Sequence, residues 1–210
     1  MAAGGRHRDA AAHTSAGVIS ARAAGMNRAP ALMAAVAGAT LARLVLGGTA
    51  PAASVPAALV FSAALLAAAV LGGARPARFP WTGVPLGVAG AAALVAISLV
   101  GVPAVTLGAR AQQATLAWWV PLVTVVAAAE ELVFRGVLFD AVRVRSSDAV
   151  AIAVTALLFA AIHLPLYGAA ALPIDLCVGV FLGCLRVGAG TVTAPLIAHV
   201  LADVATGWVG

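Results

Sequence analysis

Long apolar stretches, each about as long as a membrane is thick, constrain this chain more than any other feature. A helix needs about 20 apolar residues to cross a bilayer, and it satisfies its own backbone hydrogen bonds there, whereas an open sheet does not. We therefore predict an all-α, polytopic membrane bundle of about seven transmembrane helices. The stretches lie near residues 29–48, 53–73, 83–107, 115–139, 148–166, 169–186 and 191–209.

The composition supports this prediction. Of the 210 residues, 63% are hydrophobic and only 9% are charged, against roughly 25% charged in soluble domains. So few charges exclude a soluble enzyme, a nucleic-acid binder and a disordered protein. The lipid bilayer is the expected partner, and the net charge of +5 is assigned to orientation in the membrane, not to a nucleic-acid partner.

The arginines predict that orientation. With the N-terminus in the cytoplasm, only Arg110 falls on the outside, which agrees with the excess of positive charge on the cytoplasmic side of membrane proteins. Tryptophan and tyrosine near the span ends suit an aromatic belt. We expect a multi-pass protein of the bacterial cytoplasmic membrane. The inside arginines are Arg6, Arg8, Arg22, Arg28, Arg75, Arg78, Arg143, Arg145 and Arg186.

Two regions are predicted. Residues 1–28 form a flexible cytoplasmic tail because they show no apolar periodicity, and Met26 is an alternative start. Residues 29–210 form the membrane domain; a signal peptide over 26–52 is disfavoured because Arg43 interrupts it and further spans follow. Cys177 and Cys184 are seven residues apart, about 10 Å along one helix. We expect two small buried side chains, not a disulfide.

The only glutamates, Glu130 and Glu131, are adjacent inside an apolar stretch. An ionised carboxylate near the bilayer centre costs roughly 2.5–3.5 kcal/mol, so such groups are commonly functional. Arg135 follows Glu131 by four residues in the acid-first order that favours a helical ion pair. Glu131 and Arg135 are therefore predicted to pair, which leaves Glu130 facing elsewhere as a general base or acid.

Two further pairs of residues occur at helical spacing. Phe159 and His163 share a helix face, and Pro165 predicts that this helix ends or kinks there. His199 and Asp203 share a face of the last helix. In one bundle interior, Glu130 and the two histidines could activate water and steady an oxyanion, which indicates hydrolysis of an acyl bond. Snorkelling to the membrane surface explains the charges near other span ends, namely those of Arg43, Asp175 and Arg186.

Glu-Glu-x-x-x-Arg, then Phe-x-x-x-His, then His-x-x-x-Asp on successive helices resembles the CPBP family of CAAX prenyl endopeptidases and bacteriocin-processing proteins. The resemblance covers about residues 115–207. It implies that Glu130 and His163 activate water and that His199, helped by position 203, binds the oxyanion. Glu131, Arg135 and Phe159 would support them. Family members cleave membrane-associated peptides, and the eukaryotic ones remove the last three residues after a prenylated cysteine.

Position 203 departs from the commoner pattern, in which the family has Asn. Asn can donate a hydrogen bond to an oxyanion, whereas an ionised Asp cannot. Asp203 is therefore either protonated, or it orients His199 and does not itself contact the oxyanion. Counting along the helices at about 1.5 Å per residue also places His163 near 22 Å from the cytoplasmic side, against about 13 Å for Glu130 and 12 Å for His199. Glu130 and His163 can hold the same water only if the structure brings the two side chains to a similar depth.

Three alternatives remain beside a cofactor-free glutamate peptidase. Glu130, His163 and His199 are acceptable zinc ligands, although no His-Glu-x-x-His pair is present. Buried glutamate and histidine also mark ion paths in transporters and proton relays, although no internal repeat is evident. A non-catalytic scaffold or immunity protein is the third alternative, although such members usually lose motif residues. We predict the peptidase, with a membrane-associated peptide as substrate.

Overall fold

A computed structural model describes residues 28–74, 80–101 and 116–209, and within these ranges every regular element is a helix. Residues 1–27 of the predicted tail, with the alternative start at Met26, lie outside the described residues, and so do Arg75, Arg78 and Arg110. Arg28, the last residue assigned to the tail, is the first residue of α2. The elements are α2 (Arg28–Gly47), α3 (Val55–Leu71), η1 (Trp81–Gly83), α4 (Val84–Gly101), α5 (Leu116–Glu131), η2 (Leu132–Leu138), α6 (Phe139–Arg143), α7 (Asp148–Tyr167), η3 (Ala169–Ala171), α8 (Leu172–Ala189) and α9 (Thr193–Val209).

The all-helical class predicted from sequence is confirmed, and four described segments are long and apolar enough to cross a membrane. Two shorter apolar helices, Val55–Leu71 and Thr193–Ala205, accompany them. The total of about seven crossings stays a prediction. The four segments are Arg28–Gly47, Trp81–Ser98, Asp148–Tyr167 and Ala169–Ala189.

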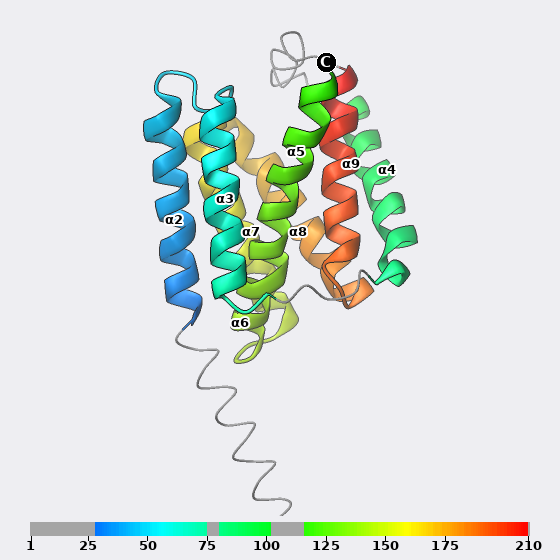
Figure 1. Cartoon of the computed structure of the whole chain (residues 1–210). Coiled ribbons are helices and arrows are strands. Elements are labelled where there is room, and N and C mark those ends of the chain that lie inside the picture. Colours follow the sequence, from blue (N-terminus) through cyan, green and yellow to red (C-terminus); the bar gives the residue numbers. More distant parts are fainter. Residues whose placement is uncertain (1–27, 75–79, 102–115, 210) are drawn as a thin grey trace, which may run out of the picture.

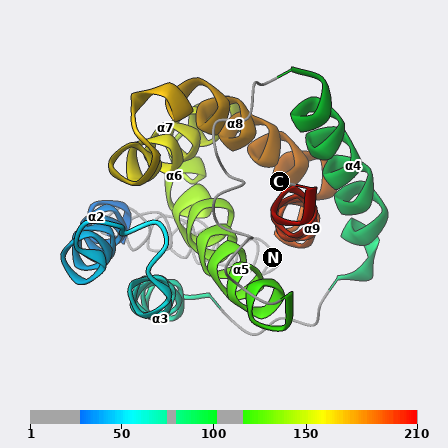
Figure 2. The same ribbon diagram turned by 90° about the horizontal axis from the view of Figure 1, so that it is seen from above.

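The helix that carries the glutamates occupies the centre of the bundle. α5 packs against α3 on one side and α9 on the other, while α2 pairs with α3, α7 with α8, and α4 with α9. The view along the bundle shows the α2–α3 pair, the α7–α8 pair and the α4–α9 pair arranged around α5 (Figures 1 and 2). α9, which bears the third motif, thus packs directly on α5, and α7, which bears the second motif, packs on η2.

The predicted single span at 115–139 is interrupted in the structure. α5 ends at Glu131, the second of the two glutamates, and a π-helix, η2, replaces the α-helical pattern from Leu132 to Leu138. Gly136 has non-helical dihedrals of φ −91° and ψ −106°. A π-helix arises from i to i+5 hydrogen bonds and is common at functional sites. No local propensity in this apolar sequence predicts it.

α7 contains Pro165 and ends two residues later, at Tyr167. Gly168, with φ +81°, follows the helix end, since this positive φ favours glycine. A kink of the helix at Pro165 stays a prediction.

The expectation that Cys177 and Cys184 are buried is wrong. Both are exposed, because α8 buries a different face against its neighbours.

Close approach between α7 and α8 depends on Gly179. A Cβ built there would lie 2.9 Å from Cα of Ala156, so the two backbones would have to separate. We expect Gly179→Ala to lower the free energy of unfolding by about 1–3 kcal/mol, measured by denaturant titration in detergent. Gly38→Ala is the matched control, because a Cβ there meets nothing within 4 Å. Equal stability of the two variants would contradict the close packing.

Candidate active site

The centre of the site is the carboxylate of Glu131, which is fully buried at the end of α5. Its Oε1 accepts a hydrogen bond from Nη1 of Arg135 at 2.8 Å and another from Nδ1 of His199 at 2.9 Å. The ion pair with Arg135 is the one expected from the i,i+4 spacing. The bond to His199 was not expected, and it ties α5 to α9.

Glu130 lies close to a histidine that the sequence did not predict as its direct neighbour. Its Oε2 lies 3.9 Å from Nε2 of His199, on the opposite side of the imidazole from Glu131. The same Nε2 lies 3.6 Å from Oδ2 of Asp203. Two carboxylates therefore surround one histidine nitrogen, because α9 packs on α5 and presents His199 between the adjacent glutamates.

His163 is held differently, by its own helix. Its Nδ1 lies 2.7 Å from the carbonyl oxygen of Phe159. A carbonyl can only accept, so Nδ1 carries the proton of this bond, and in a neutral imidazole Nε2 then has a free lone pair. The ring also stacks on Tyr167 at 5.5 Å between centroids. Among the described residues, no nitrogen of His163 comes within 4.0 Å of a Glu130 oxygen.

Phe159 joins the two histidines. Its ring centroid is 4.4 Å from that of His163 and 5.7 Å from that of His199. The guanidinium of Arg135 lies 4.6 Å from the same centroid, within the range of a cation–π interaction. Both histidine rings thus contact the same phenylalanine, whereas a shared water between Glu130 and His163 stays a prediction.

The π-helix is stabilised by two arginines. Nη2 of Arg135 donates to the carbonyl oxygen of Gly179 in α8 at 3.0 Å. In return, Nε of Arg186 in α8 donates to the carbonyl oxygen of Arg135 at 2.9 Å, and its Nη2 pairs with Asp140 at 3.0 Å. Arg186 is buried and does not snorkel, so that expectation is wrong. A tertiary partner for a span-end arginine is not visible in a single sequence.

Arg43 is a second arginine for which snorkelling is wrong. It is only 5% exposed, and its guanidinium carbon lies 5.0 Å from the centroid of Phe61. α2, the first described helix, also packs against η2 and α7, which carry motif residues. The sequence reasoning missed this neighbour relation.

The zinc alternative does not fit this arrangement. Among the described residues, no group of three or more His, Cys, Asp or Glu side chains could hold a metal ion. The runner-up ligands Glu130, His163 and His199 therefore do not form a zinc site as placed here.

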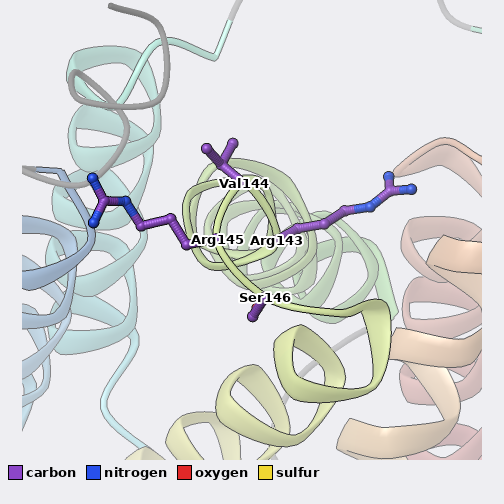
Figure 3. Close-up of a pocket in the computed structure, with 4 residues that line it drawn as sticks. All are labelled: Arg143, Val144, Arg145 and Ser146. Atoms are coloured by element: carbon purple, nitrogen blue, oxygen red, sulfur yellow. The ribbon is translucent and has the colours of Figure 1, made fainter. Parts of the chain in front are cut away.

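A separate open pocket lies at the turn after α6, where Arg143 and Arg145 extend in opposite directions from the helix end (Figure 3). Val144 and Ser146 complete its lining. It begins twelve residues after Glu131 in the chain, beyond the π-helix η2. This pocket marks a basic helix end and takes no part in the glutamate–histidine cluster.

Comparisons with known proteins agree with the motifs. Residues 112–205 match a family described as type II CAAX prenyl endopeptidase Rce1-like, which confirms the CPBP resemblance. The match includes both glutamates, both motif histidines and Asp203, but not α2. No curated protein and no solved structure matches the chain.

The buried ion pair provides a stability test. Arg135→Gln removes the partner of a fully buried carboxylate, and we expect it to lower the free energy of unfolding by about 3–5 kcal/mol, because Glu131 then remains buried with an uncompensated charge. Arg143→Gln is the control, since its pair with Asp148 has side chains 50% and 39% exposed and is worth about 1 kcal/mol or less. Similar losses for both variants in detergent unfolding would contradict the structure.

Proposed function

We propose, from the Rce1-like match over residues 112–205, that this chain is an intramembrane endopeptidase that hydrolyses a peptide bond in a membrane-associated or lipidated peptide. The apolar helices and the matched family point to a membrane protein. The observation that carries the proposal is His199, which lies between Glu130 and Glu131 and contacts the phenylalanine that holds His163. All three motifs thus meet at one place.

In the proposed reaction, Glu130 and His163 activate a water molecule. The carboxylate of Glu130 takes a proton as the water oxygen attacks the carbonyl carbon of the scissile bond, and the free lone pair of His163 accepts the water's other hydrogen bond. The proton passes to the leaving amine when the tetrahedral intermediate collapses. Because the two side chains are not in direct contact, the water would occupy the space between them.

His199 is proposed to stabilise the oxyanion. Its Nδ1 is fixed by Glu131, so its Nε2 points toward Glu130 and Asp203. A nitrogen held in this way can donate to a developing oxyanion without reorganising, which is the main advantage of a preorganised site. Glu131, Arg135 and Phe159 act by positioning, because each contacts a catalytic side chain or its partner.

Asp203 is proposed to orient His199. Its Oδ2 is 3.6 Å from Nε2 of His199, and its side chain is 40% exposed, far more than that of Glu130. An ionised Asp203 would attract Nε2 of His199 electrostatically and so hold the orientation of the imidazole. The alternative, a protonated Asp203 that itself donates to the oxyanion, predicts that Asp203→Asn is fully active and more active than Asp203→Ala.

The proposed membrane is the bacterial cytoplasmic membrane, with the N-terminus in the cytoplasm. α2 begins and α6 ends at the end of the bundle opposite the C-terminus (Figure 1). Arg28, Arg143 and Arg145 are therefore gathered at one end, as the excess of positive charge on the cytoplasmic side requires. No observation favours a transporter or a non-catalytic scaffold over the peptidase.

Glu130→Gln and His163→Ala should abolish cleavage of membrane peptides, because each removes a group that handles the water's protons. General acid–base groups contribute typically 10²–10⁴-fold in rate, so residual activity of about 1% or less is expected. The measurement is quantitative mass spectrometry of membrane peptides from cells that carry either wild-type protein or the variant. Peptides that accumulate only with Glu130→Gln identify the substrate class.

Asp148→Asn serves as the control, because it also removes a carboxylate but at an exposed surface pair. It should retain wild-type activity. All variants should insert in the membrane to the same level and elute as a single species in detergent. Full activity of Glu130→Gln would show that the assignment is wrong.

Metal dependence can be tested separately. The cofactor-free proposal predicts that purified protein keeps its activity after prolonged treatment with a strong chelator and that it contains far less than one zinc per chain by elemental analysis. Loss of activity on chelation, with recovery on adding zinc, would replace the glutamate mechanism by the zinc alternative.

A further inference from the structure

Arg186 is a buried arginine that none of the three motifs includes. It lies on α8 with its side chain 10% exposed, and it reaches the segment that follows the two glutamates. Its Nε donates to the carbonyl oxygen of Arg135 at 2.9 Å, and its Nη2 donates to Oδ1 of Asp140 at 3.0 Å. Its guanidinium carbon also lies 5.3 Å from the centroid of the Phe139 ring. One side chain thus contacts both η2 and α6.

The carbonyl of Arg135 loses its α-helical donor where the hydrogen-bond pattern changes. In a regular α-helix, the N–H of Phe139 would donate to the carbonyl four residues earlier, that of Arg135. Here the N–H of Phe139 donates to the carbonyl oxygen of Gly136 instead. A carbonyl without a donor is costly in a membrane interior, where water cannot supply one. The bond from Arg186 therefore favours the π-helical pattern over the α-helical one.

The pattern of η2 determines where Arg135 lies relative to Glu131. Arg135 donates to Oε1 of Glu131 at 2.8 Å, and the same oxygen accepts from His199 at 2.9 Å. The other ring nitrogen of His199 faces Glu130. A shift of one residue in the helical pattern turns the following residues by about 100° around the helix axis. Arg135 would then no longer reach both Glu131 and the carbonyl oxygen of Gly179, to which it now donates.

We propose that Arg186 is a positioning residue for catalysis. By holding the carbonyl of Arg135, it fixes the π-helix η2 and thereby the orientation of Glu131 and His199. This inference rests on the proposed peptidase function and adds to it a residue from α8, the helix between the second and third motifs. Arg186 contacts neither the water nor the oxyanion in this proposal. Its effect on the reaction passes through Arg135 and Glu131 to His199.

Arg186→Lys separates the two hydrogen bonds of Arg186, because a compact ammonium keeps the charge near Asp140 but lacks the planar fork that spans both acceptors. The substrate is an acylated peptide that accumulates with Glu130→Gln protein, presented in lipid nanodiscs. We expect kcat per folded protein to fall at least about ten-fold, since small misplacements of catalytic groups are costly. KM should stay within about two-fold of wild type, because the substrate contacts are unchanged.

Asp140→Asn and Arg143→Gln are the matched controls. Asp140→Asn removes only the ion pair of Arg186, whose carboxylate is 58% exposed, and leaves the bond to the carbonyl of Arg135. Arg143→Gln removes an arginine from the same short helix, α6, where its own ion pair is half exposed. Both variants should keep the wild-type kcat. A loss with Asp140→Asn as large as that with Arg186→Lys would assign the effect to the surface pair and would overturn the proposal.

Proton NMR of the imidazole N–H groups tests the proposal without a substrate. In protein with isotope-labelled histidine, the Nδ1 proton of His199 is bonded to a carboxylate and that of His163 to a carbonyl of its own helix. Arg186→Lys and Arg186→Gln should shift or remove the His199 signal and leave the His163 signal in place. Asp140→Asn should leave both signals unchanged.

The NMR result distinguishes failure of this proposal from failure of the proposed function. A His199 signal that depends on Arg186 supports the positioning contact even where the wild type cleaves no peptide. An unchanged His199 signal in both Arg186 variants, or a wild-type kcat with Arg186→Lys, overturns the proposal. If Arg186→Gln fails to fold, Arg186→Lys decides. Loss of both histidine signals with Arg186→Lys would show that Arg186 supports the fold in general and would also overturn the proposal.

Discussion

One carboxylate oxygen holds the site together. Oε1 of Glu131 accepts from Arg135 and from His199 at nearly equal distances, so α5, the π-helix η2 and α9 meet at a single buried atom. An isolated ion pair in such a place gains little, because desolvation offsets the attraction. Here Arg135 also donates to the carbonyl oxygen of Gly179 in α8 and lies over the ring of Phe159 in α7. These two contacts offset part of the cost of burying the guanidinium.

The π-helix makes this arrangement possible, and it depends on contacts made elsewhere. It begins at the residue after Glu131, and Gly136 within it departs from helical dihedrals. An interrupted helix leaves backbone carbonyls that need donors, and in lipid water cannot provide them. Arg186 from α8 donates to the carbonyl of Arg135 and pairs with Asp140. The irregular backbone is therefore covered by protein, which is the condition under which membrane proteins tolerate it.

Local periodicity in the sequence predicts some features of the fold and the site but not others. The helices follow from the length of the apolar stretches, and the contact between Glu131 and Arg135 follows from four-residue spacing. The second hydrogen bond of Glu131, to His199, joins residues 68 apart and depends on which helices are neighbours. The same limit explains Arg43 and Arg186: each is near a span end in sequence, yet tertiary packing covers it with protein, so snorkelling was the wrong interpretation.

His163 and His199 have different proposed functions because different groups hold their imidazole rings. His163 gives its Nδ1 proton to a neutral backbone carbonyl, which fixes one tautomer and leaves Nε2 as an acceptor. His199 gives its Nδ1 proton to a carboxylate, and two further carboxylates face its Nε2. Acidic groups on both sides favour a ring that donates from both nitrogens. An acceptor suits work on water and a double donor suits an oxyanion, so the groups that hold each ring support the two different functions proposed for the histidines.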